Sequence, residues 1–66
     1  MLNEETKSKI IQKIENYAQA TRETDTILDC LVGDFRDQDE KEVLRFACKE
    51  CREYGFRPPM YDWENK

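Results

Sequence analysis

The sequence predicts an all-α protein, a small bundle of three helices. Apolar residues recur at helical spacing along most of the chain, and no glycine or proline occurs before Gly33. The chain has 66 residues, the length of one domain, and a domain this small buries only about 60% of the surface that its unfolded chain exposes. We therefore expect marginal stability and self-association into a homo-oligomer.

The first predicted helix follows Asn3, a residue type that caps helix N-termini well and that precedes two glutamates here. Apolar and small residues then gather in an arc of about 120° around the helix axis, opposite polar ones. This arc comprises Ile10, Ile11, Ile14, Tyr17, Ala18 and Thr21. The pattern is typical of an amphipathic helix with one buried face.

The segment T-R-E-T-D-T marks the start of the second predicted helix. Threonine and aspartate side chains bond readily to nearby backbone groups, so they favour N-caps over helix interiors. We expect the N-cap at Thr24 or Asp25 and the end of this helix near Gly33. Its apolar face comprises Ile27, Leu28, Leu31, Val32 and Phe35.

The same region also allows one long helix over residues 4–32. Apolar residues and threonines from Ile10 to Phe35 are spaced alternately four and three residues apart, which is the register of a coiled coil. The resulting helical hairpin would dimerise, because its shorter partner helix would leave part of the stripe uncovered. The oligomer interface expected on this stripe comprises Ile10, Ile14, Tyr17, Leu28 and Leu31.

The third predicted helix, over residues 37–54, has the clearest start and stop signals. A capping box begins at Asp37, with a second register available two residues later at Asp39. Gly55 can adopt the left-handed conformation that ends a helix in a Schellman motif, and Phe56 would then fold back onto the helix. The core face comprises Val43, Leu44, Ala47, Cys48, Cys51 and Tyr54.

Residues 1–56 thus form the predicted helical domain, and residues 57–66 form an aromatic-rich C-terminal tail. The tail contains Met60, Tyr61 and Trp63 close together. Disordered tails usually lack aromatic residues. We therefore expect this tail either to pack on the bundle or to bind a partner.

Charge is unevenly distributed along the chain, whose formal net charge is −4. Residues 24–42 contain seven acids and two bases. Such an acidic belt repels phosphate backbones, so we expect a protein partner with a basic surface and no direct nucleic-acid binding. No apolar run reaches the ~20 residues of a membrane span, and the first residues lack the features of a signal peptide. We expect a cytoplasmic protein that does not associate with membranes.

Residues suited to catalysis or metal binding are few. The sequence has no histidine, one serine and no glycine-rich phosphate loop, which argues against an enzyme. Cys48 and Cys51 match a C-x-x-C pattern, but Cys30 is the only further thiol and a structural zinc site needs four ligands. We interpret the cysteine pair as small core residues and expect no cofactor and no metal. A zinc- or ligand-binding module remains the alternative.

The function that the sequence favours is non-enzymatic protein binding, in which acidic residues steer the chain toward its partner and aromatic residues anchor it. The expected partner-binding residues are an acidic corner (Asp34, Asp37, Asp39 and Glu40) and three aromatic anchors (Phe46, Tyr61 and Trp63). In composition alone, the chain resembles small phage-encoded inhibitors of host defence or nucleic-acid-handling proteins, which would act in the host cytoplasm. A structural oligomerisation unit is a further alternative.

Overall fold

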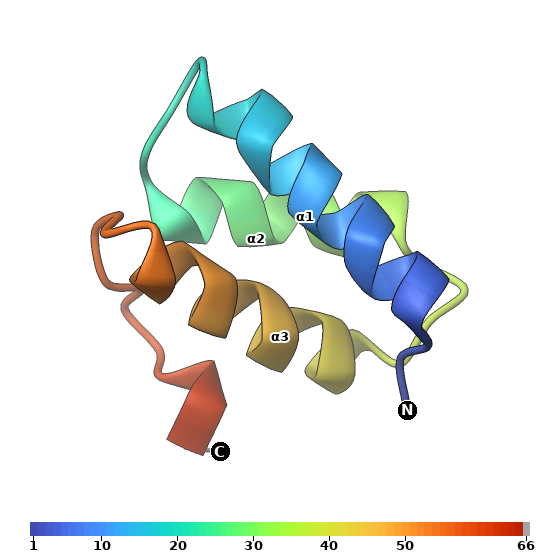
Figure 1. The fold of residues 1–66 in the computed structure, drawn as a ribbon. Coiled ribbons are helices and arrows are strands. Elements are labelled where there is room, and N and C mark those ends of the chain that lie inside the picture. The colour runs from blue at the N-terminus through green and yellow to red at the C-terminus, as the bar shows by residue number, and fades with distance from the viewer. Residues whose placement is uncertain (66) are drawn as a thin grey trace.

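A computed structural model describes residues 1–65 and shows three α-helices around one core (Figure 1). The helices are α1 (Glu4–Ala18), α2 (Thr24–Asp34) and α3 (Glu40–Glu53), and a short 3-10 turn, η1 (Trp63–Asn65), follows them. The chain beyond α3 turns back, so that η1 lies beside α3. The prediction of a three-helix bundle is confirmed.

The alternative of one long helix is wrong, because the chain leaves the helical conformation after Ala18. The backbone amides of Ala20 and Thr21 both donate to the Tyr17 carbonyl at 2.9 Å, which closes the last turn of α1. The Thr21 hydroxyl then accepts a hydrogen bond from the Glu23 amide at 3.1 Å. Such local bonds from threonine compete with helical ones. Glu23 is extended, with φ −82° and ψ 111°, and α2 starts at the next residue.

Side-chain caps begin α1 and α3. The Asn3 carboxamide oxygen accepts from the Thr6 amide at 2.7 Å, as the sequence predicts. For α3 the chain adopts the later of the two capping registers: the Asp39 carboxylate accepts from the Glu42 amide at 3.2 Å. Asp37 therefore lies in the connection between α2 and α3 and not at the helix start.

The predicted Schellman motif ends α3. Gly55 has a φ of 81°, in the left-handed region that favours glycine. Its amide donates to the Arg52 carbonyl at 3.0 Å, and the Phe56 amide donates to the Cys51 carbonyl at 3.1 Å. The Phe56 side chain packs against the core. Local sequence signals were sufficient to place this helix end.

Tyr54 differs from the prediction that placed it on the core face. Its side chain is 43% exposed. The hydroxyl donates to the exposed Glu15 carboxylate at 3.1 Å, so the polar end of the ring stays at the surface. The ring itself stacks on Phe56, with 5.4 Å between the ring centroids.

The core draws side chains from all three helices. The largest fully buried ones are Ile10, Ile14, Ile27, Leu31, Val43, Thr24, Cys48 and Cys51. Four residues of the expected oligomer interface lie in this core instead, because α1 and α2 fold against each other within one chain: Ile10, Ile14, Leu28 and Leu31 are at most 2% exposed. Only Tyr17 of that set is partly exposed. The stripe is thus packed inside the single chain in this fold.

The first half of the tail is held by the segment before α2. Thr24 and Asp25, which were expected to cap α2, bind the tail instead. The Thr24 hydroxyl donates to the Arg57 carbonyl, and the Asp25 carboxylate accepts from the Met60 amide at 3.2 and 3.3 Å. Glu23 and Arg57 add an ion pair at 2.9 Å and an isolated parallel β-bridge. These contacts make the tail part of the fold.

The second half of the tail is held on α3. Arg52 forms ion pairs with Asp62 at 3.4 Å and with Glu64 at 2.8 Å. Trp63 packs against the hydrophobic core. Lys66, the last residue of the predicted tail, lies outside the described residues.

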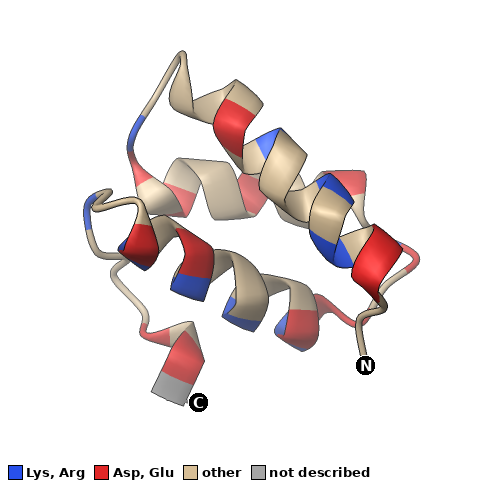
Figure 2. Cartoon of the chain, viewed as in Figure 1, with Lys and Arg blue, Asp and Glu red and all other residues tan. Residues whose placement is uncertain are grey.

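Acidic and basic residues both occur along α1 and α3, whereas α2 carries acidic residues alone (Figure 2). Helix α2 contains three aspartates and no lysine or arginine. On α3, Lys41, Arg45 and Lys49 follow one another at intervals of four residues, so they share one exposed side of the helix. Across the described part of the chain, no helix is long and apolar enough to span a bilayer.

Candidate functional site

The structure does not keep the acidic corner together. Asp34 and Asp37 line a hollow beside α1. Asp39 caps α3. Glu40 lies on another side of the bundle, in a groove between α2, α3 and the tail. Nearness in sequence was therefore a poor guide to which of these carboxylates share a surface.

The three aromatic anchors are also divided. Tyr61 and Trp63 line the same groove as Glu40. Phe46 lines a different hollow near the N-terminus, with Leu2 and Lys7 among its neighbours. The Lys7 ammonium lies 5.9 Å from the centroid of the Phe46 ring, a cation–π contact. Phe46 therefore cannot anchor the same segment of a partner as the two tail aromatics.

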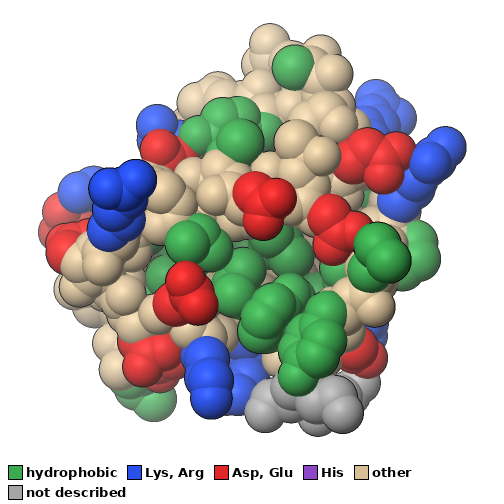
Figure 3. All heavy atoms as spheres, turned by 180° about the vertical axis from the view of Figure 1, so that it is seen from behind, with side chains coloured by type: hydrophobic (Ala, Val, Ile, Leu, Met, Phe, Trp, Pro, Cys, Tyr) green, Lys and Arg blue, Asp and Glu red, His purple; other side chains and the backbone are tan. Residues whose placement is uncertain are grey.

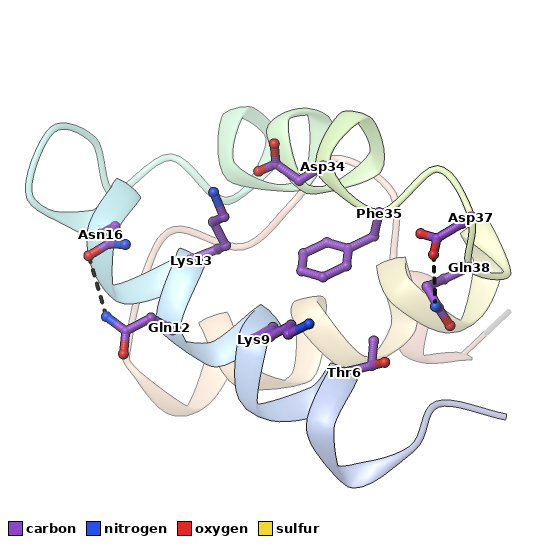
Figure 4. A pocket seen from close by; sticks show the side chains of 9 residues that line it. All are labelled: Thr6, Lys9, Gln12, Lys13, Asn16, Asp34, Phe35, Asp37 and Gln38. Carbon is purple, nitrogen blue, oxygen red and sulfur yellow. Dashed lines mark hydrogen bonds between the residues drawn. The ribbon is translucent and has the colours of Figure 1, made fainter.

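The hollow beside α1 has a volume of about 460 Å³ and a mixed polar lining (Figure 4). Lys9 and Lys13 project from α1 on one side, and Asp34 and Asp37 approach from the end of α2 and the following connection. Phe35 lies between them. Because two positive and two negative side chains share this hollow, their fields largely offset each other.

Asp34 already has a partner within the chain. Its carboxylate accepts a hydrogen bond from the Tyr17 hydroxyl. This hydrogen bond, together with burial of the ring, raises the pKa of Tyr17 to about 12. A partner that bound Asp34 would have to compete with this bond.

The α2–α3 groove, as we name the second hollow, combines an apolar floor with acidic borders. Its volume is about 650 Å³. It is lined by apolar residues of both helices and the tail (Leu28, Val32, Leu44, Met60, Tyr61 and Trp63) and by three acids (Asp25, Asp29 and Glu40). Figure 3 shows hydrophobic side chains gathered on this face, with acidic side chains above and to the left of them.

Two tail residues in the lining of the groove are large exposed apolar side chains. Met60 is 96% exposed and Tyr61 is 47% exposed. Exposure of large apolar side chains next to one another is characteristic of binding surfaces. Sequence reasoning identified Tyr61 but did not single out Met60 as a binding residue.

The carboxylates of the groove create a negative field over the apolar floor. Asp25 and Asp29 lie one helical turn apart on α2, where like charges repel each other. Glu40 faces them from the start of α3. Within residues 1–65, no ion pair or hydrogen bond involves the side chains of Asp29 or Glu40. Their charge is therefore available to a partner.

A small basic notch adjoins the groove. It has a volume of about 240 Å³ and is lined by Lys41, Arg45, Tyr61 and Trp63. Tyr61 and Trp63 thus border both hollows, and their ring centroids are 4.4 Å apart at an interplanar angle of 54°. We call this pair the aromatic ridge. Acids lie on one side of the ridge and bases on the other.

The two cysteines of the C-x-x-C pair lie in the core. Cys48 and Cys51 are buried and Cys30 is exposed, and all three thiols are free. Burial raises the pKa of the Cys48 thiol and raises that of Cys51 to about 11, so neither is an activated thiolate. Among the described residues, no three cysteine or carboxylate side chains are grouped as a metal ion requires. The interpretation of the C-x-x-C pair as core residues agrees with this burial.

Several residues of the groove and of the adjoining notch were missed from sequence, although signals for them existed. Asp25 and Asp29 flank Leu28 at intervals that place all three on neighbouring sides of α2. Lys41 and Arg45 are one turn apart on α3. The juxtaposition of these pairs depends on how α2, α3 and the tail pack, which the sequence pattern alone does not specify.

Comparisons with protein-family models, with curated proteins and with solved structures find no match to this chain. The geometry of the described residues is thus what bears on function.

Proposed function

We propose that this chain is a protein-binding module and that the α2–α3 groove is its docking surface. The observation that carries the proposal is an open apolar floor whose charged lining is entirely acidic. The occupant that fits is an amphipathic helix of a protein partner, with apolar side chains on one face and lysine or arginine on both flanks. Helices of this kind commonly bind in grooves formed by other helices.

Apolar contacts supply the binding energy in this account. Met60 and Tyr61 lose exposed surface when a helix covers the floor, and aromatic side chains dominate the energetics of many interfaces. Because the groove is small, we expect a dissociation constant near the micromolar range, as is usual for small interfaces.

The carboxylates supply orientation and a fast association rate. Asp29 belongs to α2 and Glu40 to α3, so basic side chains on the two flanks of a helix bound between them would each meet an acid. Complementary charge of this type steers encounter and weakens with salt.

When the groove binds a basic segment of a partner, that segment can no longer bind its usual ligand. Carboxylates of the groove would compete with phosphates for the same lysine and arginine side chains. We therefore propose an inhibitory role toward a partner that uses a basic amphipathic helix, such as a nucleic-acid-handling protein.

A synthetic peptide tests the docking surface directly. The probe is an amphipathic peptide of leucine and lysine, about four helical turns long, titrated into isotopically labelled protein and followed by two-dimensional NMR. The largest chemical-shift changes should occur at Leu28, Val32, Leu44, Tyr61 and Trp63. A rise of about tenfold in salt concentration should weaken binding. The control peptide has glutamate in place of every lysine and should not bind. Shift changes centred on the hollow beside α1, or equal binding of both peptides, would refute the proposal.

A further inference from the structure

Charge changes sign across the face that contains the α2–α3 groove. The groove side of the aromatic ridge holds Asp25, Asp29 and Glu40, and the other side holds Lys41 and Arg45. In Figure 3 acidic side chains lie above and to the left of the hydrophobic cluster, and basic side chains lie below it to the left. The face therefore runs from acidic through apolar to basic.

We propose that this face binds a second copy of the chain in a symmetric homodimer. A two-fold axis through the aromatic ridge would place the acidic side of each copy against the basic side of the other. The apolar ridge would meet itself at the centre. Two-fold dimers use the same surface on both subunits, so that surface has to be complementary to itself. The acidic and basic sides of this face meet that requirement.

The spacing of the charges supports the pairing. Asp25 and Asp29 are four residues apart on α2, and Lys41 and Arg45 are four residues apart on α3. Each pair therefore spans about 6 Å along its helix. The Asp25 carboxylate also accepts from the Met60 amide within the chain, so the direct pair expected across the axis is the one made by Asp29, with Asp25 adding to the negative field.

The basic side chains are available for such contacts. Within residues 1–65, neither Lys41 nor Arg45 takes part in an ion pair. Arg52, further along α3, is engaged by Asp62 and Glu64 and holds the tail in place. The tail thus forms the ridge and pairs with Arg52, and not with Lys41 or Arg45.

This dimer differs from the one expected from the heptad stripe. The stripe is buried within each chain, whereas Met60 and Tyr61 are exposed on the new face. Pairing would cover both. It would also cover the α2–α3 groove, so the dimer and the basic partner would exclude each other; this last consequence rests on the proposed function.

Sedimentation equilibrium of the full chain over a range of concentrations tests the dimer. We expect a monomer–dimer equilibrium that weakens as salt rises. The variant Lys41→Glu/Arg45→Glu and the variant Asp29→Lys/Glu40→Lys should each dimerise at least ten times more weakly than the natural sequence. Mixed in equal amounts, the two variants should form a heterodimer, because each restores the charge complement that the other lacks.

The matched control is Lys9→Glu/Lys13→Glu, which makes the same charge change on α1 and should leave dimerisation within about twofold. A natural chain that stays monomeric at every concentration, or variants that do not recover on mixing, would overturn the dimer. Failure of the proposed function is distinguishable, because Lys41→Glu/Arg45→Glu retains the groove acids and should still bind the leucine–lysine peptide.

Discussion

The two hollows that border α2 hold similar chemical groups but arrange them differently. The hollow beside α1 contains two lysines and two aspartates facing each other around Phe35. The α2–α3 groove contains three acids, and the adjoining bases lie beyond the aromatic ridge. In the first hollow the two signs are mixed, although Lys9 pairs with Glu5 and Asp34 accepts from the Tyr17 hydroxyl. At the groove the two signs are separated by the ridge. The proposed docking role of the groove rests on this separation of charge and not on the number of charged residues.

The aromatic residues of the two hollows differ in the same way. Phe35 is 9% exposed and belongs to the core, whereas Tyr61 is 47% exposed and stands above it. Trp63 is intermediate in exposure, because one part of its side chain packs on the core and it also lines the groove. We expect the buried ring to contribute mainly to stability and the exposed rings mainly to binding.

Phe35→Ala should give the largest effect on stability. Removing a buried phenylalanine leaves a cavity and typically lowers the free energy of unfolding by about 3 kcal/mol or more. Urea denaturation measures this change. Because so small a domain has only about 5 kcal/mol of stability in total, Phe35→Leu provides a milder variant that should cost about 1 kcal/mol. Either variant, where folded, should bind the leucine–lysine peptide normally. Loss of binding by a folded variant would contradict the assignment of Phe35 to stability and of the exposed rings to binding.

Trp63→Ala should have a smaller effect on stability and a larger one on binding. The side chain is only partly buried, so we expect a loss of about 2 kcal/mol. The same substitution removes half of the aromatic ridge and should weaken peptide binding at least tenfold. Urea denaturation and peptide titration on one preparation separate the two effects. A variant that loses stability but keeps full affinity would show that the ridge is only structural.

The thiols should report whether the tail covers α3 as described. A chromogenic disulfide reagent should react quickly with Cys30, which is exposed, and at least a hundredfold more slowly with the two buried thiols. Cys48 lies next to the backbone of Trp63 and Glu64. Loosening the tail by Trp63→Ala should therefore accelerate the reaction of Cys48 more than that of Cys51. Three equally fast thiols in the folded natural chain would be inconsistent with this structure.

The smallest predicted effect concerns Tyr17, on the α1 side. Its hydrogen bond to Asp34 raises its pKa to about 12, whereas an unfolded tyrosine titrates near 10. The folded chain therefore retains the proton between these values, and the stability from this group is present below about pH 10 and is lost as pH rises to about 12. Tyr17→Phe should make unfolding less sensitive to pH across that range. The buried Cys51, with a pKa of about 11, contributes a separate alkaline loss that the variant retains. An unchanged pH profile in Tyr17→Phe would refute the assigned role.

Elements encoded by neighbouring residues could be predicted from the sequence. Asn3 caps α1, and Gly55 ends α3, because each acts through backbone groups only a few residues away. The anchoring of the tail could not be predicted in the same way. Thr24 and Asp25 have the local signature of N-caps, but their partners in the tail lie 33 and 35 residues further along the chain.

The candidate site was predicted only in part, for a related reason. Glu40, Tyr61 and Trp63 do meet in one groove. Asp34 and Asp37 were grouped with them because they are close in sequence, but the turn between α2 and α3 directs them to the side of α1. Which charges share a surface depends on helix packing, and the periodicity of a single helix does not encode it.

The central claim is that sorted charge makes the α2–α3 groove a docking surface, and two matched double variants test it most directly. Asp29→Lys/Glu40→Lys alters the groove, and Asp34→Lys/Asp37→Lys alters the hollow beside α1. Each changes the formal net charge from −4 to 0. Calorimetric titration with the leucine–lysine peptide should show at least tenfold weaker binding for the groove variant and a change within about twofold for the other. Equal losses in both variants would mean that net charge alone attracts the peptide, and the account of the groove would be contradicted.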